Sequence, residues 1–290
     1  MSGNMTLLAS VLRFRSATTI LKSPLCRSLW LRNGRGVAYS STANVKNQRQ
    51  QEQDDAAASA RPMDMAFAPV NDFHMNQYAV ACTQTKQAAI IDCGASSSQE
   101  LGVFLHWLQE NNYQLTTVWQ THAHLDHVAG LGLLRAEYEE IPIHMHVKER
   151  GIYNSFDQRK KDFGFQVERD GNLPPDTEIS FFDDTQKFMK LGALTFHVFS
   201  TPGHSPGHVG FYESLSKSFF GGDFIMQGSI GRTDFPTSSP EDMNTSLETF
   251  VQNMDDDVVI FSGHGPATTL KREKQVNPFL QAYSNYWGGA

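Results

Sequence analysis

Four side chains of the kind that bind metals stand within six positions of one another in the segment THAHLDH. His122, His124 and His127 supply three imidazoles, and Asp126 supplies one carboxylate. Imidazole and carboxylate are the ligands that suit zinc, iron or manganese. Alternation along the chain directs His122 and His124 to the same side, whereas Asp126 and His127 lie past the bend. The spacing therefore predicts a turn that serves two metal ions.

Three further residues of this kind follow apolar segments later in the chain. His204 stands between two Pro-Gly pairs in TPGHSPGH, Asp223 follows two glycines in FFGGDF, and His264 is framed by glycines in FSGHGP. Pro-Gly turns hold one side chain in place, and glycine permits a close approach of the backbone. These segments supply the ligands that THAHLDH lacks.

The seven residues together predict a binuclear centre with two symmetric ligand sets. One ion is assigned to His122, His124 and His204, the other to Asp126, His127 and His264, and Asp223 bridges both. Asp126 and Asp223 are also the predicted catalytic residues. A divalent ion lowers the pKa of bound water to about 7, so a bridging hydroxide is expected to attack a carbonyl. The predicted chemistry is hydrolysis.

Other polar residues near these motifs have two interpretations each. Asp92 ends the apolar run AAIID and is either a hydrogen-bond partner of a ligand imidazole or an ordinary turn residue. His208 is predicted to be structural. His144 and His146 alternate along a strand and are predicted to be surface histidines, not ligands. Arg232 is predicted to be a structural ion-pair partner, with binding of a substrate carboxylate as the alternative.

Each ligand segment follows a predicted strand, and loops at strand ends can converge on one edge of a sheet. Period-two and β-branched patterns predict strands over 77–81, 88–92, 116–120, 141–147, 195–200, 208–212, 218–221 and 258–261. Period-3.6 patterns predict helices over 99–111, 128–138 and 240–253, the last with Ser239 as its N-cap. Residues 151–175 are expected to form a long loop or short helices.

The N-terminal segment differs in charge from the rest of the chain. The first 51 residues hold eight of the 24 basic residues and no acidic ones, which leaves 16 basic against 31 acidic residues, or −15, in the remainder. An Arg- and Ser-rich opening without acids is typical of transit peptides. We expect a disordered mitochondrial transit peptide over 1–50, containing a short amphipathic helix from Leu7 to Leu12, a polar linker over 51–61 and a folded domain over 62–290. A disordered basic tail is the alternative.

Composition also limits the partners of the folded part. Its acidic balance argues against a nucleic-acid partner, and no run of 18 apolar residues predicts a membrane span. Cys82 and Cys93 show no disulfide spacing and are expected to be small core residues in a reducing compartment, which agrees with the mitochondrial matrix. The expected partner is therefore a small-molecule substrate.

The motifs THAHLDH, TPGHSPGH, GGD and SGHGP, in this order, resemble the metallo-β-lactamase superfamily. The segments QGSIGRTDFP (227–236) and GHGPATTLKREKQVNPFLQ (263–281) resemble its glyoxalase II branch, in particular the short, single-domain hydroxyacylglutathione hydrolase-like proteins. The resemblance covers about residues 65–281 and implies an α/β fold, an αββα sandwich in a single domain. It implies two divalent metal ions, zinc first and iron or manganese also tolerated. It also implies hydrolysis of glutathione thioesters such as S-lactoylglutathione.

The alternative function comes from the same superfamily. The persulfide dioxygenases share the HxHxDH motif but use one iron held by two histidines and one aspartate. In that family Asp-Tyr follows the final histidine, and the TPGH turn continues as Thr-Asn-Gly-Cys. Here Gly265-Pro266 follows His264, and Ser205-Pro206-Gly207-His208 follows the turn histidine. Both differences favour the hydrolase.

Overall fold

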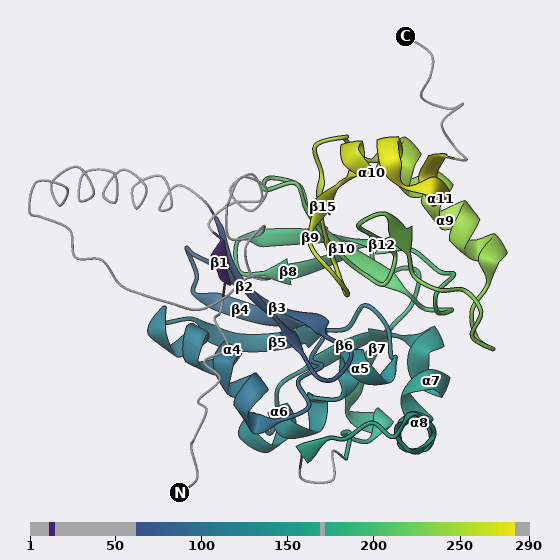
Figure 1. The fold of residues 1–290 in the computed structure, drawn as a ribbon. Coiled ribbons are helices and arrows are strands. Elements are labelled where there is room, and N and C mark those ends of the chain that lie inside the picture. The colour runs from purple at the N-terminus through teal and green to yellow at the C-terminus, as the bar shows by residue number, and fades with distance from the viewer. Residues whose placement is uncertain (1–11, 15–61, 169–171, 282–290) are drawn as a thin grey trace, which may run out of the picture.

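Two β-sheets pack face to face, with helices on both outer sides (Figure 1). The computed structural model describes residues 12–14, 62–168 and 172–281. Alternation within β3 (Met75–Cys82) builds two layers of core, because successive side chains of a strand point to opposite faces. Tyr78 and Val80 pack between the sheets, whereas Ala79 and Ala81 pack under the helices. This four-layer arrangement confirms the predicted αββα sandwich.

The first sheet has seven strands, which lie side by side in chain order. They are β1 (Leu12–Phe14), β2 (Met63–Val70), β3, β4 (Gln87–Ile91), β5 (Gln114–Trp119), β6 (Ile143–His146) and β7 (Ile179–Phe182). Strands β4 to β7 are parallel, so their C-terminal ends lie at the same edge of the sheet. Strands β3 and β4 pair antiparallel and form a hairpin.

The second sheet has six strands in the order β15-β14-β11-β10-β9-β8. They are β8 (Phe188–Leu191), β9 (Leu194–Ser200), β10 (Val209–Glu213), β11 (Ser218–Gly222), β14 (Val259–Ser262) and β15 (Thr268–Thr269), and a separate hairpin joins β12 (Ile225–Met226) to β13 (Ser229–Ile230). Strands β11 and β14 are parallel neighbours. Their C-terminal ends therefore meet, and they do so beside the corresponding edge of the first sheet.

The helices cover the outer faces of the two sheets (Figure 1). They are α4 (Ser98–Glu110), α5 (Leu125–Val128), α6 (Leu131–Glu137), α7 (Arg150–Asn154), α8 (Phe156–Phe163), α9 (Pro240–Asn253), α10 (Leu270–Val276) and α11 (Pro278–Gln281), with 3₁₀ turns at Val147–Glu149 and Asp176–Glu178. Phe104 and Leu134 anchor α4 and α6 on the first sheet, and Phe250 anchors α9 on the second. None of the helices described is long and apolar enough to cross a membrane.

Most predicted elements are confirmed within two residues at either end, with one correction among the helices. The helix predicted over 128–138 begins only at Leu131, as α6; Val128 is the last residue of the separate helix α5, and Ala129 and Gly130 lie between the two helices. The backbone N–H of Gly130 donates to the carbonyl of Cys93 at 2.9 Å. A Cβ at this glycine would lie 2.8 Å from the Ala95 carbonyl oxygen. The chain bends here because its backbone packs directly against the loop after β4.

The N-terminal prediction also needs one correction. Residues Leu12–Phe14 form β1, antiparallel to β2, and do not continue the amphipathic helix expected to end at Leu12. Without β1, strand β2 would be the edge of the sheet and would leave backbone groups unpaired. The three residues of β1 pair with part of β2. The rest of the predicted transit peptide and linker, 1–11 and 15–61, lies outside the described residues. Cys82 and Cys93 are buried and unpaired, as predicted.

Candidate metal centre

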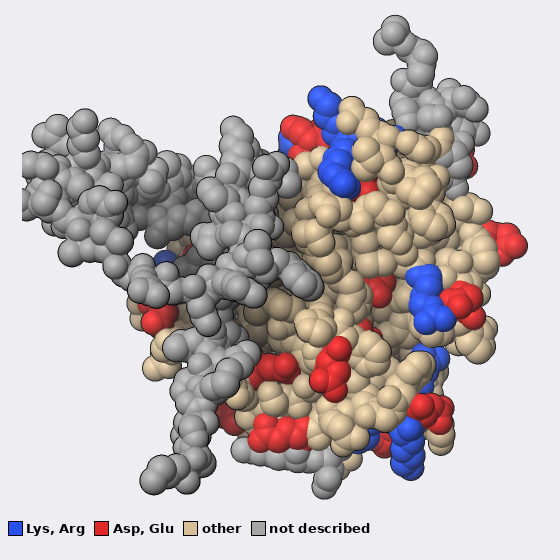
Figure 2. All heavy atoms as spheres, viewed as in Figure 1, with Lys and Arg blue, Asp and Glu red and all other residues tan. Residues whose placement is uncertain are grey.

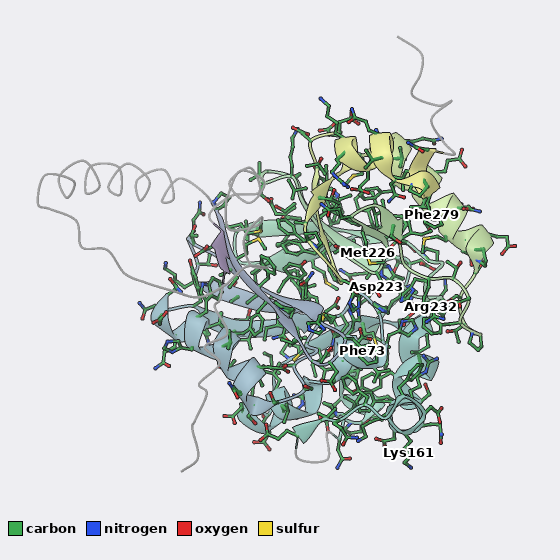
Figure 3. All side chains as sticks on the ribbon, viewed as in Figure 1. Phe73, Lys161, Asp223, Met226, Arg232 and Phe279 are labelled. Atoms are coloured by element: carbon green, nitrogen blue, oxygen red, sulfur yellow. The ribbon has the colours of Figure 1, made fainter. Side chains whose placement is uncertain are left out.

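The seven predicted ligands meet at one edge of the sandwich, although they come from four separate strand ends. His122 to His127 follow β5, His204 follows β9, Asp223 follows β11 and His264 follows β14. Asp223, labelled in Figure 3, contacts residues from both ligand groups and lines the cavity described below. The predicted convergence of strand-end loops is thus observed. The role of each residue as a ligand stays a prediction.

The first group contains three imidazoles. One ring nitrogen from each of His122, His124 and His204 lies within 4.8 Å of the others. His124 Nδ1 is 2.8 Å from His204 Nε2. The Nε2 atom of His122 is buried and has no hydrogen-bond partner among the described residues. A buried nitrogen without a partner, clustered with two further imidazoles, fits the coordination of a metal ion.

The second group combines two imidazoles with one carboxylate. Asp126, His127 and His264 place ligand atoms within 4.8 Å of one another. His264 Nε2 lies 3.1 Å from Asp126 Oδ2, and His127 Nε2 lies 3.7 Å from the same oxygen. These two groups coincide with the two predicted ligand sets; a third group, Asp92, His122 and His127, also places its atoms within 4.8 Å of one another.

Asp223 lies between the two groups. Its Oδ1 is 3.4 Å from His127 Nε2, and its Oδ2 is 3.5 Å from His204 Nε2 and 3.6 Å from His264 Nε2. Contact with both groups through both carboxylate oxygens is the geometry expected of a shared ligand. A Cβ on Gly263 would lie 2.2 Å from Asp223 Oδ1, so this position has room only for glycine.

The protonation of the first group and of Asp223 suits cation binding. For His127 and His264, burial lowers the pKa, but the neighbouring carboxylates outweigh it and raise the pKa above its usual value. Burial, and the neighbouring imidazole of His127, hold the pKa of His122 well below its usual value. Burial and the imidazole of His204 lower the pKa of His124 to about 3. For Asp223, burial raises the pKa, but the charge of His127 and its hydrogen bond outweigh that effect and hold the pKa well below its usual range. Neutral imidazoles and an ionised carboxylate are the forms that bind metals.

Asp92 supports the first ligand segment, which decides between its two interpretations. Its Oδ2 is 2.9 Å from His127 Nδ1, and its two oxygens accept from the backbone N–H and the hydroxyl of Thr121 at 2.7 and 2.8 Å. An acceptor on Nδ1 fixes the tautomer that leaves Nε2 free to bind a metal. Asp92 therefore orients the ring of His127, a predicted ligand.

The remaining histidines have structural positions. His208 is structural, as predicted: its Nε2 accepts the backbone N–H of Asp223 at 3.2 Å, so its Nδ1 donates to the hydroxyl of Thr201 at 2.8 Å. The prediction of a surface position for His146 is wrong, because only 3% of its surface is exposed. Strand β6 lies inside the first sheet, where the outer helices and the second sheet cover both faces. His144 on the same strand is half-buried.

Glu149 is a buried residue of the site that the sequence did not single out. Its Oε2 accepts the backbone N–H of Ala123 at 2.8 Å, and its Oε1 accepts the backbone N–H of Gly207 at 2.7 Å. One carboxylate thereby ties the turn that carries His122 and His124 to the turn that carries His204. Its local sequence, VKER, has the pattern of a solvated charged segment, so no local signal marked it.

A cavity of about 350 Å³ opens onto the cluster and gives a small molecule access to it. Its walls are mostly apolar, with Phe73, Leu125, Phe163, Met226, Ile230 and Phe235 among the lining residues. Viewed as in Figure 3, the surface around Asp223 is largely uncharged, and charged side chains gather toward its margins (Figure 2). The volume falls in the range of small-molecule sites.

Arg232 lines this cavity and is already paired. Its Nε and Nη2 donate to the two oxygens of Asp234 at 2.6 and 2.7 Å, and its guanidinium lies over the Phe235 ring at 4.3 Å. This contact confirms the predicted ion pair. Lys274, in the C-terminal motif, pairs with Asp256 at 2.6 Å and does not line the cavity.

The fold, the order of the ligand motifs and the geometry of the cluster define a class of protein. The family model described as "Metallo-beta-lactamase superfamily" matches residues 71–264, a span that begins beside β2 and ends at His264. The chain belongs to this superfamily.

Individual relatives share most of the described domain. The chain is 33% identical over 222 residues to hydroxyacylglutathione hydrolase GloC of Haemophilus influenzae, covering 77% of this chain and 100% of the relative. Among solved structures it is similar to the B3 metallo-β-lactamase BLEG-1, with a TM-score of 0.63, 28% identity and coverage of 74% and 99%. It is also similar to TTHA1623 in a di-iron-bound form, with a TM-score of 0.62, 30% identity and coverage of 73% and 99%.

Proposed function

We propose that this protein is a thioester hydrolase of the hydroxyacylglutathione hydrolase type, acting on S-lactoylglutathione or a similar glutathione thioester. The observation that carries the proposal is the position of Asp223, which contacts both ligand groups through its two oxygens. Two groups with a shared carboxylate suit hydrolysis, whereas a dioxygenase needs one redox-active iron. The similarity to GloC supports the same reaction class.

We propose further that the two groups hold two divalent ions, zinc first, with iron or manganese as substitutes. His122, His124 and His204 would hold one ion, Asp126, His127 and His264 the other, and Asp223 both. Such ions lower the pKa of water and polarise a carbonyl, which is the chemistry that hydrolysis needs. The donors are nitrogen and oxygen throughout, which suits all three metals.

The protein's own side chains would orient this chemistry. Asp92 holds the Nδ1 side of His127, and the carbonyl of Arg232 accepts from His204 Nδ1 at 2.8 Å, so each Nε2 lone pair is directed at the cluster. The apolar walls of the cavity exclude water from the reacting group. A thiolate leaves without protonation at neutral pH far more readily than an alkoxide. No separate acid is therefore required.

The test follows two signals in parallel on the metal-loaded protein. Hydrolysis predicts loss of thioester absorbance with S-lactoylglutathione and no oxygen uptake with glutathione persulfide. Robust oxygen uptake with negligible thioester cleavage would overturn the proposal in favour of the persulfide dioxygenase. If the protein cleaved only acyl-coenzyme A thioesters, the proposed reaction would still be thioester hydrolysis, but the thiol half of the substrate would be coenzyme A instead of glutathione.

The binuclear assignment predicts close to two metal equivalents per chain by elemental analysis. Asp223→Ala should reduce activity by more than the roughly 10–100-fold expected for loss of a supporting hydrogen bond, because Asp223 contacts both groups. His208→Ala is the control: its ring hydrogen-bonds the backbone N–H of Asp223 and the hydroxyl of Thr201 but belongs to neither ligand group, so the loss should be far smaller. One equivalent with full activity, and no gain from added metal, would contradict the assignment.

A further inference from the structure

Helix α8 contributes two side chains to the lining of the cavity. Arg159 and Phe163 both line the cavity, and they are four residues apart, which places them on one face of the helix. Phe156 on the same face is buried and anchors the helix in the first core. The helix, held in place by Phe156, therefore presents the guanidinium of Arg159 and the ring of Phe163 to the cavity.

Arg159 differs from Arg232 in its partners. Its Nε donates to the hydroxyl of Ser155 at 3.0 Å, and no carboxylate of the described residues forms an ion pair with it. Glu149 is within its electrostatic reach: burial raises the pKa of Glu149, and Arg159 is among the groups that lower it. Both Glu149 oxygens, however, already accept backbone N–H groups. The guanidinium of Arg159 thus retains donors for a ligand, whereas Asp234 occupies those of Arg232.

The surroundings of Arg159 strengthen its attraction for an anion. Phe163 and Phe73 form an apolar rim at the mouth of the cavity, with 54% and 43% of their surfaces exposed. Phe73 is held by stacking on Phe165 at 5.4 Å between ring centroids. A bound ligand would cover these rings and exclude water from the guanidinium, and a charge-assisted hydrogen bond gains strength as water is excluded.

We propose that Arg159 is a specificity-determining residue that binds a carboxylate of the substrate at the α8 wall, while Phe163 and Phe73 cover the adjoining apolar part. The inference rests on the proposed thioester hydrolysis and names its substrate class, a thioester that carries a carboxylate. The carboxylate belongs either to the thiol half, as in glutathione, or to the acyl half, as in a dicarboxylic acid. Both sources present the same group to Arg159.

Three thioesters distinguish a carboxylate on the thiol half from one on the acyl half. S-lactoylglutathione carries its carboxylates on the thiol half, S-glutaryl-N-acetylcysteamine carries one on the acyl half, and S-lactoyl-N-acetylcysteamine carries none. Arg159→Gln should raise KM roughly tenfold for the substrate whose carboxylate it binds, with kcat within about twofold. The neutral thioester should be unaffected. Arg159→Lys should restore KM only in part, because an ammonium lacks the planar fork.

Lys161→Gln is the matched control. Lys161 belongs to the same helix and carries the same charge, but it is exposed and points away from Asp223 and the cavity (Figure 3). The change in charge is therefore equal, and only the position differs. Equal KM values for Arg159→Gln and Lys161→Gln on both carboxylate substrates would overturn the proposal. An equal loss on all three thioesters would also overturn it, since that pattern indicates a structural role.

A binding measurement keeps this test separate from the proposed reaction. S-methylglutathione and glutarate cannot be hydrolysed, and calorimetry reports their binding whether or not the protein cleaves any thioester. The wild type and Lys161→Gln should bind one of these probes about tenfold more tightly than Arg159→Gln does. If no thioester is cleaved but this difference appears, the proposed reaction fails and the carboxylate site stands. If neither probe binds, or Arg159→Gln binds equally, the carboxylate site is rejected.

Discussion

Glu149 illustrates how one buried side chain positions several predicted ligands. Its carboxylate joins two turns through the backbone N–H groups of Ala123 and Gly207, so both turns keep their spacing only while both oxygens accept. In Glu149→Gln, one acceptor becomes an NH₂ group that cannot accept. We expect metal affinity and activity to fall roughly 10–100-fold, as for loss of other groups that orient metal ligands. Competition with a metal chelator measures the affinity directly.

Glu213 offers a matched control for this prediction. It is also buried and accepts two backbone N–H groups, those of Leu215 and Ser216, but in the turn between β10 and β11. Glu213→Gln should lower the melting temperature and leave metal affinity unchanged. If both variants lose metal equally, general destabilisation would explain the result, and the specific role of Glu149 would be wrong.

At the scale of elements, the end of β14 must approach the end of β11 closely. A Cβ added at Gly263 would lie 2.2 Å from Asp223 Oδ1 and 2.7 Å from His127 Cε1. Gly263→Ala should therefore displace Asp223 and reduce turnover roughly 100-fold, because displacements of about 1 Å have effects of that size. Bound metal, measured by elemental analysis, should fall with it.

A substitution at Gly265 distinguishes the effect of steric crowding from the effect of backbone strain. Gly265 has a φ of +75° and no atom within 4 Å of an added Cβ. Gly265→Ala should cost about 1–2 kcal/mol of stability, from the left-handed conformation alone, and retain its metal. Normal metal content in Gly263→Ala would show that the strand ends can separate without loss of the site.

At the scale of the whole molecule, the charge asymmetry separates the N-terminal segment from the acidic domain. The truncated protein starting at Pro62 loses β1, which leaves β2 as an edge strand. None of the described contacts of the seven ligands involves β1. We therefore expect this protein to fold and to keep full activity, with at most a modest drop in melting temperature. Loss of most turnover would show that the N-terminal segment belongs to the enzyme.

The same N-terminal segment carries the proposed targeting signal. We propose that residues 1–50 direct the protein to the mitochondrial matrix, because their basic, acid-free composition is that of a transit peptide. A reporter fused to the full chain should enter mitochondria, and one fused to the chain from Pro62 should not. Equal distribution of both fusions would favour the alternative of a plain basic tail.

The amino-acid sequence alone was enough to name the candidate ligands and the order of the strands that carry them. Spacing in THAHLDH is a local property, and the glycines and prolines around His204, Asp223 and His264 mark turns that depend on nearby residues only. Period-two and period-3.6 patterns likewise reflect local burial. For these reasons the seven residues and most elements could be named before any contact was known.

The fold was needed to show which groups meet across long separations in the chain. Glu149 reaches Ala123 and Gly207 because β6 lies beside β5 and faces the second sheet, a relation that no local pattern encodes. The division of 128–138 at Gly130 depends on packing against the loop after β4. Arg159 and Arg232 are the same residue type and both line the cavity. They differ because the carboxylate of Asp234 pairs with Arg232, whereas no carboxylate of the described residues pairs with Arg159. Strand pairing, packing and charge neutralisation depend on which residues are neighbours in space, and the tertiary fold determines those neighbours.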